Sequence, residues 1–249
     1  MKSYFAGARR ALISLLLGVW LPAPPLRAEA ADDFVPCKIF ERTKPIFPVR
    51  ALEQGITHGQ VWLFLEVDQD GRLSDVLAFA HSGDDFAKSA LDAIEQWKFT
   101  PAVYSGEPVR SINRINIYFE VNGVIAYTRR VGEPNERSVE GVRFDYRPCT
   151  LNELDRVPKA LSRPSPVYTK EWIREGRTGA VILDYFIDED GYTRFPRVVG
   201  NPDELLAAAT IEAVKTWRFD PPRRQGKRVL AQVRQEFRFE PEKSTAERE

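Results

Sequence analysis

Few side chains in this sequence are placed to do chemistry. The chain has two histidines, His58 and His81, and neither lies at zinc-ligand spacing from a second ligand. The tetrapeptide DQDG at residues 68–71 resembles the start of a calcium loop, but the later ligands and the acidic residue at position 12 are missing. We therefore expect both histidines to lie in loops, residues 68–71 to form a turn, and no metal to bind.

The sequence also lacks the motifs of common enzyme classes. It contains no nucleophile elbow, no phosphate-binding loop and no dinucleotide fingerprint. We expect a protein that is not an enzyme and uses no cofactor. Lys and Arg together number 36, as do Asp and Glu, and without residues 1–30 the balance is 32 against 35. This slightly acidic balance gives no basic surface, so we expect no nucleic-acid partner.

The N-terminus has the pattern of an export signal. Arg9 and Arg10 precede an apolar run at residues 11–21, and residues 28–30 (AEA) match a small-x-small cleavage site. As a helix the apolar run reaches about 16 Å, roughly half the hydrocarbon core of a membrane. We expect residues 1–30 to be a cleaved signal peptide; the alternative is an uncleaved membrane anchor.

The two cysteines occupy matching places in two similar phrases, FVPCKIFE around Cys37 and YRPCTLNE around Cys149. An exported protein folds in an oxidising compartment, where unpaired thiols are a hazard. We expect an intramolecular Cys37–Cys149 disulfide, worth about 4–5 kcal/mol in the chain-entropy treatment of a loop this long. A bridge between two chains and two separately buried thiols are the alternatives.

The strongest feature of the sequence is an internal repeat. AIEQWKFTP at residues 93–101 returns as AVKTWRFDP at residues 213–221. With a shift of 120 residues, positions 59–121 align with positions 179–241 without a gap, and 16 of the 63 aligned pairs are identical. Two copies of one domain explain this pattern. The expected organisation is a signal peptide at 1–30, a first domain at 38–130, a linker at 131–154, a second domain at 155–241 and a disordered tail at 242–249.

Both copies predict the same order of elements. The segments GQVWLFLEVDQDG and GAVILDYFIDEDG alternate apolar residues at a strand period and end in an Asp-x-Asp-Gly turn. A second strand follows, where Pro196 fits an edge or a bulge. A helix then begins near Ser82 or Asn201 and ends at Trp-x-Phe-x-Pro, before a last strand. We expect Trp97 and Trp217 to be core residues at the seam between helix and sheet.

Taken together, these residues resemble the TonB C-terminal domain family of energy-transducing proteins. The resemblance rests on Phe-Pro-x-x-Ala at residues 47–51, Gly-x-Val, Asp-x-Asp-Gly, Ala-x-x-x-Trp-x-Phe-x-Pro and FEVNG at residues 119–123. It covers roughly residues 38–123 and 155–241, although the Phe-Pro-x-x-Ala element is degraded in the second copy. It implies an α+β fold of two tandem two-layer domains, each with helices packed on a three-stranded antiparallel sheet.

The resemblance also implies a binding mode, in which an extended peptide of an outer-membrane transporter adds as a strand to the free edge of the last strand. If residues 124–131 turn back after the Asn-Gly at 122–123, they cover this edge in the first copy, and the edge near Phe237 becomes the open one. The sequence does not decide which copy binds. The expected peptide-binding residues are Lys44, Pro45, Phe47, Pro48, Ile115, Ile117, Phe119 and Phe237.

These features predict a non-catalytic periplasmic module that binds extended peptides of envelope or outer-membrane transport partners. No long Pro-rich linker follows the signal, which argues against a complete energy transducer. Two alternatives stay open: an inner-membrane-anchored energy transducer for TonB-dependent transport, and an envelope scaffold that binds the cell wall. Exposed strand edges also make a homodimer plausible.

Overall fold

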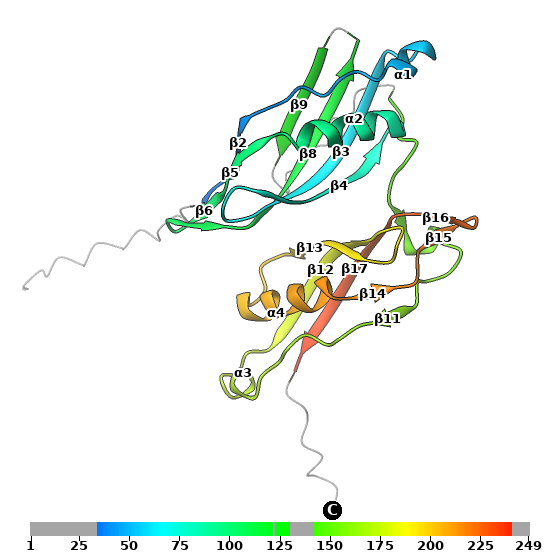
Figure 1. Ribbon diagram of the computed structural model, residues 1–249. Helices are drawn as coiled ribbons and strands as arrows, with labels where there is room; N and C mark the ends of the chain where they lie inside the picture. Colours follow the sequence, from blue (N-terminus) through cyan, green and yellow to red (C-terminus); the bar gives the residue numbers. More distant parts are fainter. Residues whose placement is uncertain (1–33, 122, 130–141, 241–249) are drawn as a thin grey trace, which may run out of the picture.

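The structure is a computed structural model that describes residues 34–121, 123–129 and 142–240. The expected signal peptide and C-terminal tail lie outside the described residues. Each sequence repeat forms one α+β unit, in which helices cover one face of a mainly antiparallel sheet (Figure 1). The expected fold class is therefore confirmed. Within the described ranges, no helix is long and apolar enough to cross a membrane.

In the first copy, the described residues form two helices and nine strands, several of them very short. They are β1 (Phe34–Val35), β2 (Lys38–Glu41), α1 (Val49–Glu53), β3 (His58–Val67), β4 (Leu73–His81), α2 (Asp84–Ile94), β5 (Lys98–Thr100), β6 (Ala102–Tyr104), β7 (Glu107–Val109), β8 (Ser111–Glu120) and β9 (Gly123–Arg129). The second copy repeats the main elements. They are β10 (Cys149–Thr150), the 3-10 helix η1 (Leu151–Glu153), β11 (Ala160–Ser162), α3 (Lys170–Arg174), β12 (Gly179–Ile187), β13 (Thr193–Val199), α4 (Glu204–Lys215), β14 (Arg218–Phe219), β15 (Arg223–Arg224), β16 (Lys227–Arg228) and β17 (Ala231–Phe239).

Each main sheet has the three expected antiparallel strands and one additional strand. In the first copy the order is β4-β3-β8-β9, and β9 pairs with β8 from Glu120↔Gly123 to Arg114↔Arg129. In the second copy the order is β10-β17-β12-β13, and the short β10 runs parallel to the start of β17. The two copies therefore differ in how their last long strand is bordered.

Strand alternation directs one face of each sheet toward its helix. On β3, Val61, Leu63 and Leu65 are buried in a core that also contains Phe86 of α2. On β12, the corresponding residues are buried with residues of α4. The helix and the sheet in each copy thus form the expected two layers.

In each copy, the Asp-x-Asp-Gly turn packs against the Trp-x-Phe segment that follows the helix. Asp188 Oδ1 accepts backbone hydrogen bonds from Asp190 and Tyr192, so this carboxylate closes a turn, as expected. Gly191 has φ +88°, and a Cβ there would lie 2.0 Å from the Phe219 carbonyl oxygen. The turn requires glycine because its backbone touches the strand that follows the helix.

The helices begin later than the sequence predicted. The N-cap of α2 is Gly83, while the Ser82 hydroxyl lies at the Gln60 backbone. The N-cap of α4 is Asp203, whose carboxylate accepts from the Leu205 and Leu206 amides. The predicted caps Ser82 and Asn201 were wrong because the Ser82 hydroxyl is taken up by the Gln60 backbone and because Asp203, two residues after Asn201, caps α4. Pro196 lies at the register shift between β12 and β13, which confirms the expected bulge.

The two copies contact each other through the sheet faces opposite to their helices. Trp62 and Phe64 of β3 and Phe79 of β4 are buried against Phe186 and Phe195 of the second copy. The Phe64 ring centroid lies 5.8 Å from those of both Phe186 and Phe195. The alternation of Val61, Leu63 and Leu65 predicted only the face of β3 that packs on the helix, and the aromatic residues Trp62 and Phe64 between them mark this second interface.

Residues of the expected linker take part in this contact. The Val142 carbonyl accepts from Gln60 Nε2 at 3.0 Å, and Phe144 packs edge-on against Trp62. Tyr146 forms an isolated bridge with His81 and hydrogen bonds to Glu189 of the second copy. The segment from Val142 onward thus joins the two sheets.

Candidate functional site

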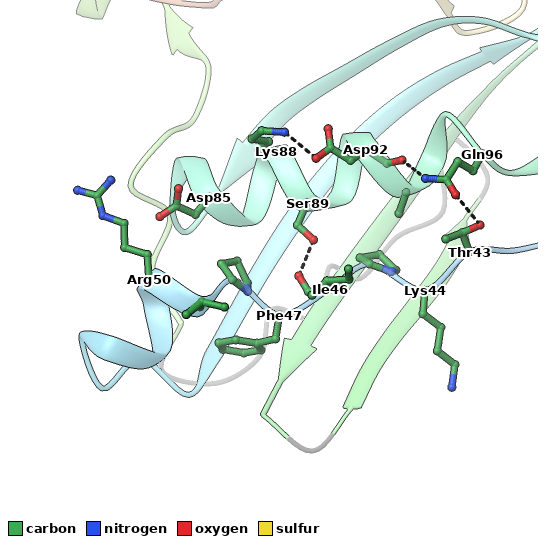
Figure 2. A pocket seen from close by; sticks show the side chains of 14 residues that line it. Thr43, Lys44, Ile46, Phe47, Arg50, Asp85, Lys88, Ser89, Asp92 and Gln96 are labelled. Atoms are coloured by element: carbon green, nitrogen blue, oxygen red, sulfur yellow. Dashed lines mark hydrogen bonds and ion pairs between the residues drawn. The ribbon is translucent and has the colours of Figure 1, made fainter.

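The leading segment of the first copy (residues 43–48) lies along helix α2. The Trp97 indole Nε1 donates to the Thr43 carbonyl at 2.7 Å, and the Ser89 hydroxyl donates to the Ile46 carbonyl at 2.5 Å. Between this segment and α2 lies an open groove of about 340 Å³, rimmed by charged side chains that include Lys44 and Asp92 (Figure 2). The predicted residues of this segment are therefore gathered at one groove.

Their side chains do not all face this groove. Pro45 is buried, and Phe47 packs edge-on against Phe86 and Phe119 at 5.4 and 6.4 Å, so it belongs to the domain core. Lys44 is exposed and Pro48 is half-buried. The most accessible apolar residue is Ile46, at 78% exposure, which we did not predict. Alternation along KPIFPV was the signal that could have revealed it.

The last strand of the first copy has no free edge along its C-terminal half. Ile115, Ile117 and Phe119 are buried beneath the helix layer, at 0%, 0% and 1% exposure. Their backbone edge is paired with β9 along Arg114–Glu120. The hairpin after Asn-Gly thus covers this edge, which is the case that we expected if residues 124–131 turn back; peptide binding by these three residues stays a prediction.

The corresponding edge of the second copy is bordered only at its start. The Cys149 amide donates to the Leu230 carbonyl at 2.8 Å, and β10 pairs with no β17 residue beyond Gln232. In a strand, the N–H and C=O groups of one residue point to the same side, and those of the next residue point to the opposite side. Because β17 pairs with β12 without a register shift, this alternation continues unbroken along β17. Beyond β10 the outward backbone groups are those of Arg234, Glu236 and Arg238. In the part of the chain that the structure describes, no strand pairs with them.

Phe237 lies on this strand, but its side chain faces the core. Its ring centroid is 5.6 Å from that of Trp217, and the side chain is 9% exposed. Phe237 therefore packs in the core, and the backbone groups of the alternate residues form the outer edge of this strand.

The exposed face of β17 carries paired charges. Arg234 Nε and Nη2 donate to the two Asp184 oxygens at 2.7 and 2.9 Å, and Arg238 donates to Glu236 at 2.8 Å. The hydrogen bonds from Arg234 hold the pKa of Asp184 below its ordinary value. This strand therefore presents ordered charges beside an unpaired backbone.

The two cysteines are free thiols. Cys37 is half-buried against the core of the first copy, and burial raises its thiol pKa. Cys149 is buried and pairs with Ala231 in β17 of the second copy. The expected Cys37–Cys149 disulfide is not present in the structure: one thiol is half-buried in the first copy and the other is buried in the second.

Both histidines lie in strands, His58 at the start of β3 and His81 at the end of β4, and not in the loops that we expected. His58 is exposed, but His81 ends β4, is 6% exposed and stacks on Tyr146 at 4.8 Å between ring centroids. Burial lowers the pKa of His81. Among the described residues no group of three potential ligands could hold a metal ion.

The fold and its strand edge define a tandem α+β protein with one closed and one open last strand. The family described as Gram-negative bacterial TonB protein C-terminal matches residues 43–121 and 164–241, more than half of the chain. The chain therefore belongs to this family, with two copies of its domain.

One curated relative agrees with this assignment, and one solved structure is also similar in sequence. Protein TonB of Vibrio cholerae serotype O1 is 33% identical over 89 residues, which are 35% of this chain and 36% of that protein. The chain thus spans about a third of the curated relative it matches. A solution NMR structure of the Pseudomonas aeruginosa TonB CTD is 30% identical, with 38% of this chain and 95% of that chain covered and a TM-score of 0.33.

Proposed function

We propose that this protein is a peptide-binding component of TonB-dependent transport in the Gram-negative cell envelope. It takes an extended segment of its partner as an added strand on β17 of the second copy. The observation that supports this most is the contrast between the copies. The edge of β8 carries β9, whereas no strand of the described residues lies beside the backbone groups of Arg234, Glu236 and Arg238.

Membership of the TonB C-terminal family supports an outer-membrane transporter as the kind of partner. The matched relative is a TonB protein, and an outer-membrane transporter with an extended periplasmic segment is the partner that strand addition suits. An added strand would place alternate side chains beside Arg234 and Arg238, so acidic side chains there fit best. On the helix face of β17, the Tyr168 ring packs against Phe239, with the ring centroids 5.3 Å apart.

Crosslinking in cells tests the proposal. A photo-crosslinking amino acid at Arg238, which is exposed at the open edge, should capture an outer-membrane transporter. The Glu236→Pro variant removes one outward N–H group while leaving the bonds to β12 in place, so capture should fall about tenfold relative to Glu236→Ala. Equal capture by the two variants, or capture of no transporter, would contradict strand addition at β17.

The mode of attachment to the envelope depends on residues 1–30. We propose a periplasmic protein released by cleavage of this segment. The mass of the mature N-terminus decides the point, since a chain that begins at Ala31 contradicts the anchored transducer and an intact N-terminus supports it.

A further inference from the structure

A second cavity lies between the two copies, away from β17. It has a volume of about 460 Å³ and is lined by residues of both copies. From the first copy come Glu66, Arg110 and Ile112; from the second come Pro196, Arg197, Val198, Ile211 and Lys215. Cavities of this size at a domain boundary are common places for small ligands.

The cavity combines an apolar wall with an excess of positive charge. Arg110 is balanced by Glu66, whose Oε1 lies 3.2 Å from Arg110 Nη1. Lys215 Nζ lies 3.4 Å from Glu212 Oε1, its one carboxylate contact among the residues that the structure describes, and Glu212 is largely exposed. Arg197 is the third cation in the lining, and its nearest carboxylate lies outside the cavity.

Arg197 has too little negative charge around it. Asp184 is its only carboxylate partner among the described residues, at 3.7 Å, and Asp184 already accepts both strong hydrogen bonds of Arg234. Arg197 Nη1 is buried and has no hydrogen-bond partner in the described residues, which is an unfavourable state for a charged donor. Burial lowers the pKa of Arg197, and the neighbouring Arg114 and Arg234 act in the same direction.

The repeat shows why a cavity remains at this place. By the 120-residue shift, Glu66 and Arg110 correspond to Phe186 and Leu230, which are 2% and 0% exposed and fill the contact between the copies. Where the second copy contributes two large apolar side chains, the first copy contributes an ion pair. Lys215 likewise corresponds to Glu95, so a cation replaces an anion. The contact between the copies is therefore closed where Phe186 and Leu230 fill it, and it is open and cationic where Glu66 and Arg110 take the corresponding places.

We propose that this cavity binds a small amphipathic anion, a carboxylate or phosphate head group carried on an apolar chain. The head group lies against Arg197 and Lys215, where it supplies the missing negative charge. The apolar chain lies along Ile112, Val198 and Ile211. Since both copies supply the lining, neither copy alone contains this site.

Calorimetric titration of the full chain tests the proposal with four probes: octanoate, octyl phosphate, octanol and inorganic phosphate. Both octyl anions should bind saturably and more tightly than octanol or inorganic phosphate; a preference between the two anions distinguishes a carboxylate source from a phosphate source. Absence of saturable binding by both octyl anions would overturn the proposal. So would equal binding of octyl phosphate and inorganic phosphate.

Variants that give one copy the residues of the other test whether the octyl anion binds in this cavity. Glu66→Phe combined with Arg110→Leu gives the first copy the side chains of the second, so it should fill the cavity and abolish octanoate binding without lowering the midpoint of urea unfolding. Lys215→Glu should weaken binding about tenfold. Lys98→Glu, at an exposed lysine of β5 that does not line the cavity, is the matched control and should bind normally. Unchanged binding by the filled variant would place the ligand elsewhere and contradict the assignment.

Discussion

At the scale of single residues, the repeated tryptophan joins the helix layer to the leading segment. Trp217 Nε1 donates to the Pro164 carbonyl at 2.8 Å, as Trp97 does to Thr43. An arginine also lies over each indole ring, Arg163 in the second copy. The residue is a core residue, as predicted, but its polar edge fixes a backbone segment, and hydropathy alone cannot show that.

Trp97→Phe and Trp217→Phe should each lower the free energy of unfolding by about 1–2 kcal/mol, because each loses one hydrogen bond and some packing. Urea unfolding of both variants measures this. If both variants keep the wild-type stability, the indole N–H groups do not hold the leading segments.

His81 makes stability depend on pH. Its pKa in the folded protein is lowered by burial, against the opposing effect of Asp84, Asp145 and Glu189. As pH falls through the ordinary histidine value near 6.5, the unfolded chain binds a proton that the folded chain does not. Stability should therefore fall between pH 7.5 and pH 5.5.

Urea titrations of the wild type and His81→Gln across this pH range isolate the contribution of this residue. The wild type should lose more stability than the variant. Parallel pH profiles would show that His81 titrates in the folded protein as it does in the unfolded chain.

At the scale of elements, the turn before β13 depends on glycine for two reasons. Gly191 has positive φ, and it also touches the Phe219 carbonyl. Gly226, in the turn between β15 and β16, has φ +76° but open space around the position of a Cβ. Both positions have positive φ but only Gly191 has a close neighbour, so a comparison of variants at the two positions separates the stability cost of backbone conformation from that of the contact.

Gly226→Ala should lower the free energy of unfolding by about 1–2 kcal/mol, the cost of an alanine in this conformation. Gly191→Ala should lose about 1–3 kcal/mol more, because the added methyl group displaces a strand. Thermal or urea unfolding compares them directly. Equal losses would mean that the contact with Phe219 does not constrain the turn.

Much of each element could be read from the sequence. Alternation in GQVWLFLEV and in GAVILDYFI predicted β3 and β12, and the Asn-Gly pair predicted the β8–β9 hairpin. The helix caps were missed because several adjacent residues are good caps. The open edge was predicted only as a choice between copies, since it depends on where β9 and β10 lie in three dimensions.

At the scale of the whole molecule, the two copies form one body through a contact that periodicity did not reveal. Trp62 and Phe64 lie at the positions that alternation assigns to solvent, and only the partner surface around Phe186 explains them. Arg194 Nε of the second copy donates to Asp75 of the first at 3.1 Å at the border of this contact. Sequence reasoning within one repeat cannot find contacts between repeats.

A double-mutant cycle tests this contact. Asp75→Ala and Arg194→Ala should each destabilise the protein, and the pair should show a coupling of about 0.5–3 kcal/mol by urea unfolding. Fully additive effects would show that the two copies do not meet at this ion pair in solution.

The most direct test of strand addition at β17 is amide hydrogen exchange of the full chain, measured with and without a purified outer-membrane transporter. In the free protein, the outward amides of Arg234, Glu236 and Arg238 should exchange quickly, while the β8 amides that face β9 exchange slowly. On adding the transporter, these three β17 amides should become protected at least about tenfold. Protection confined to the first copy, or no change at β17, would contradict the account.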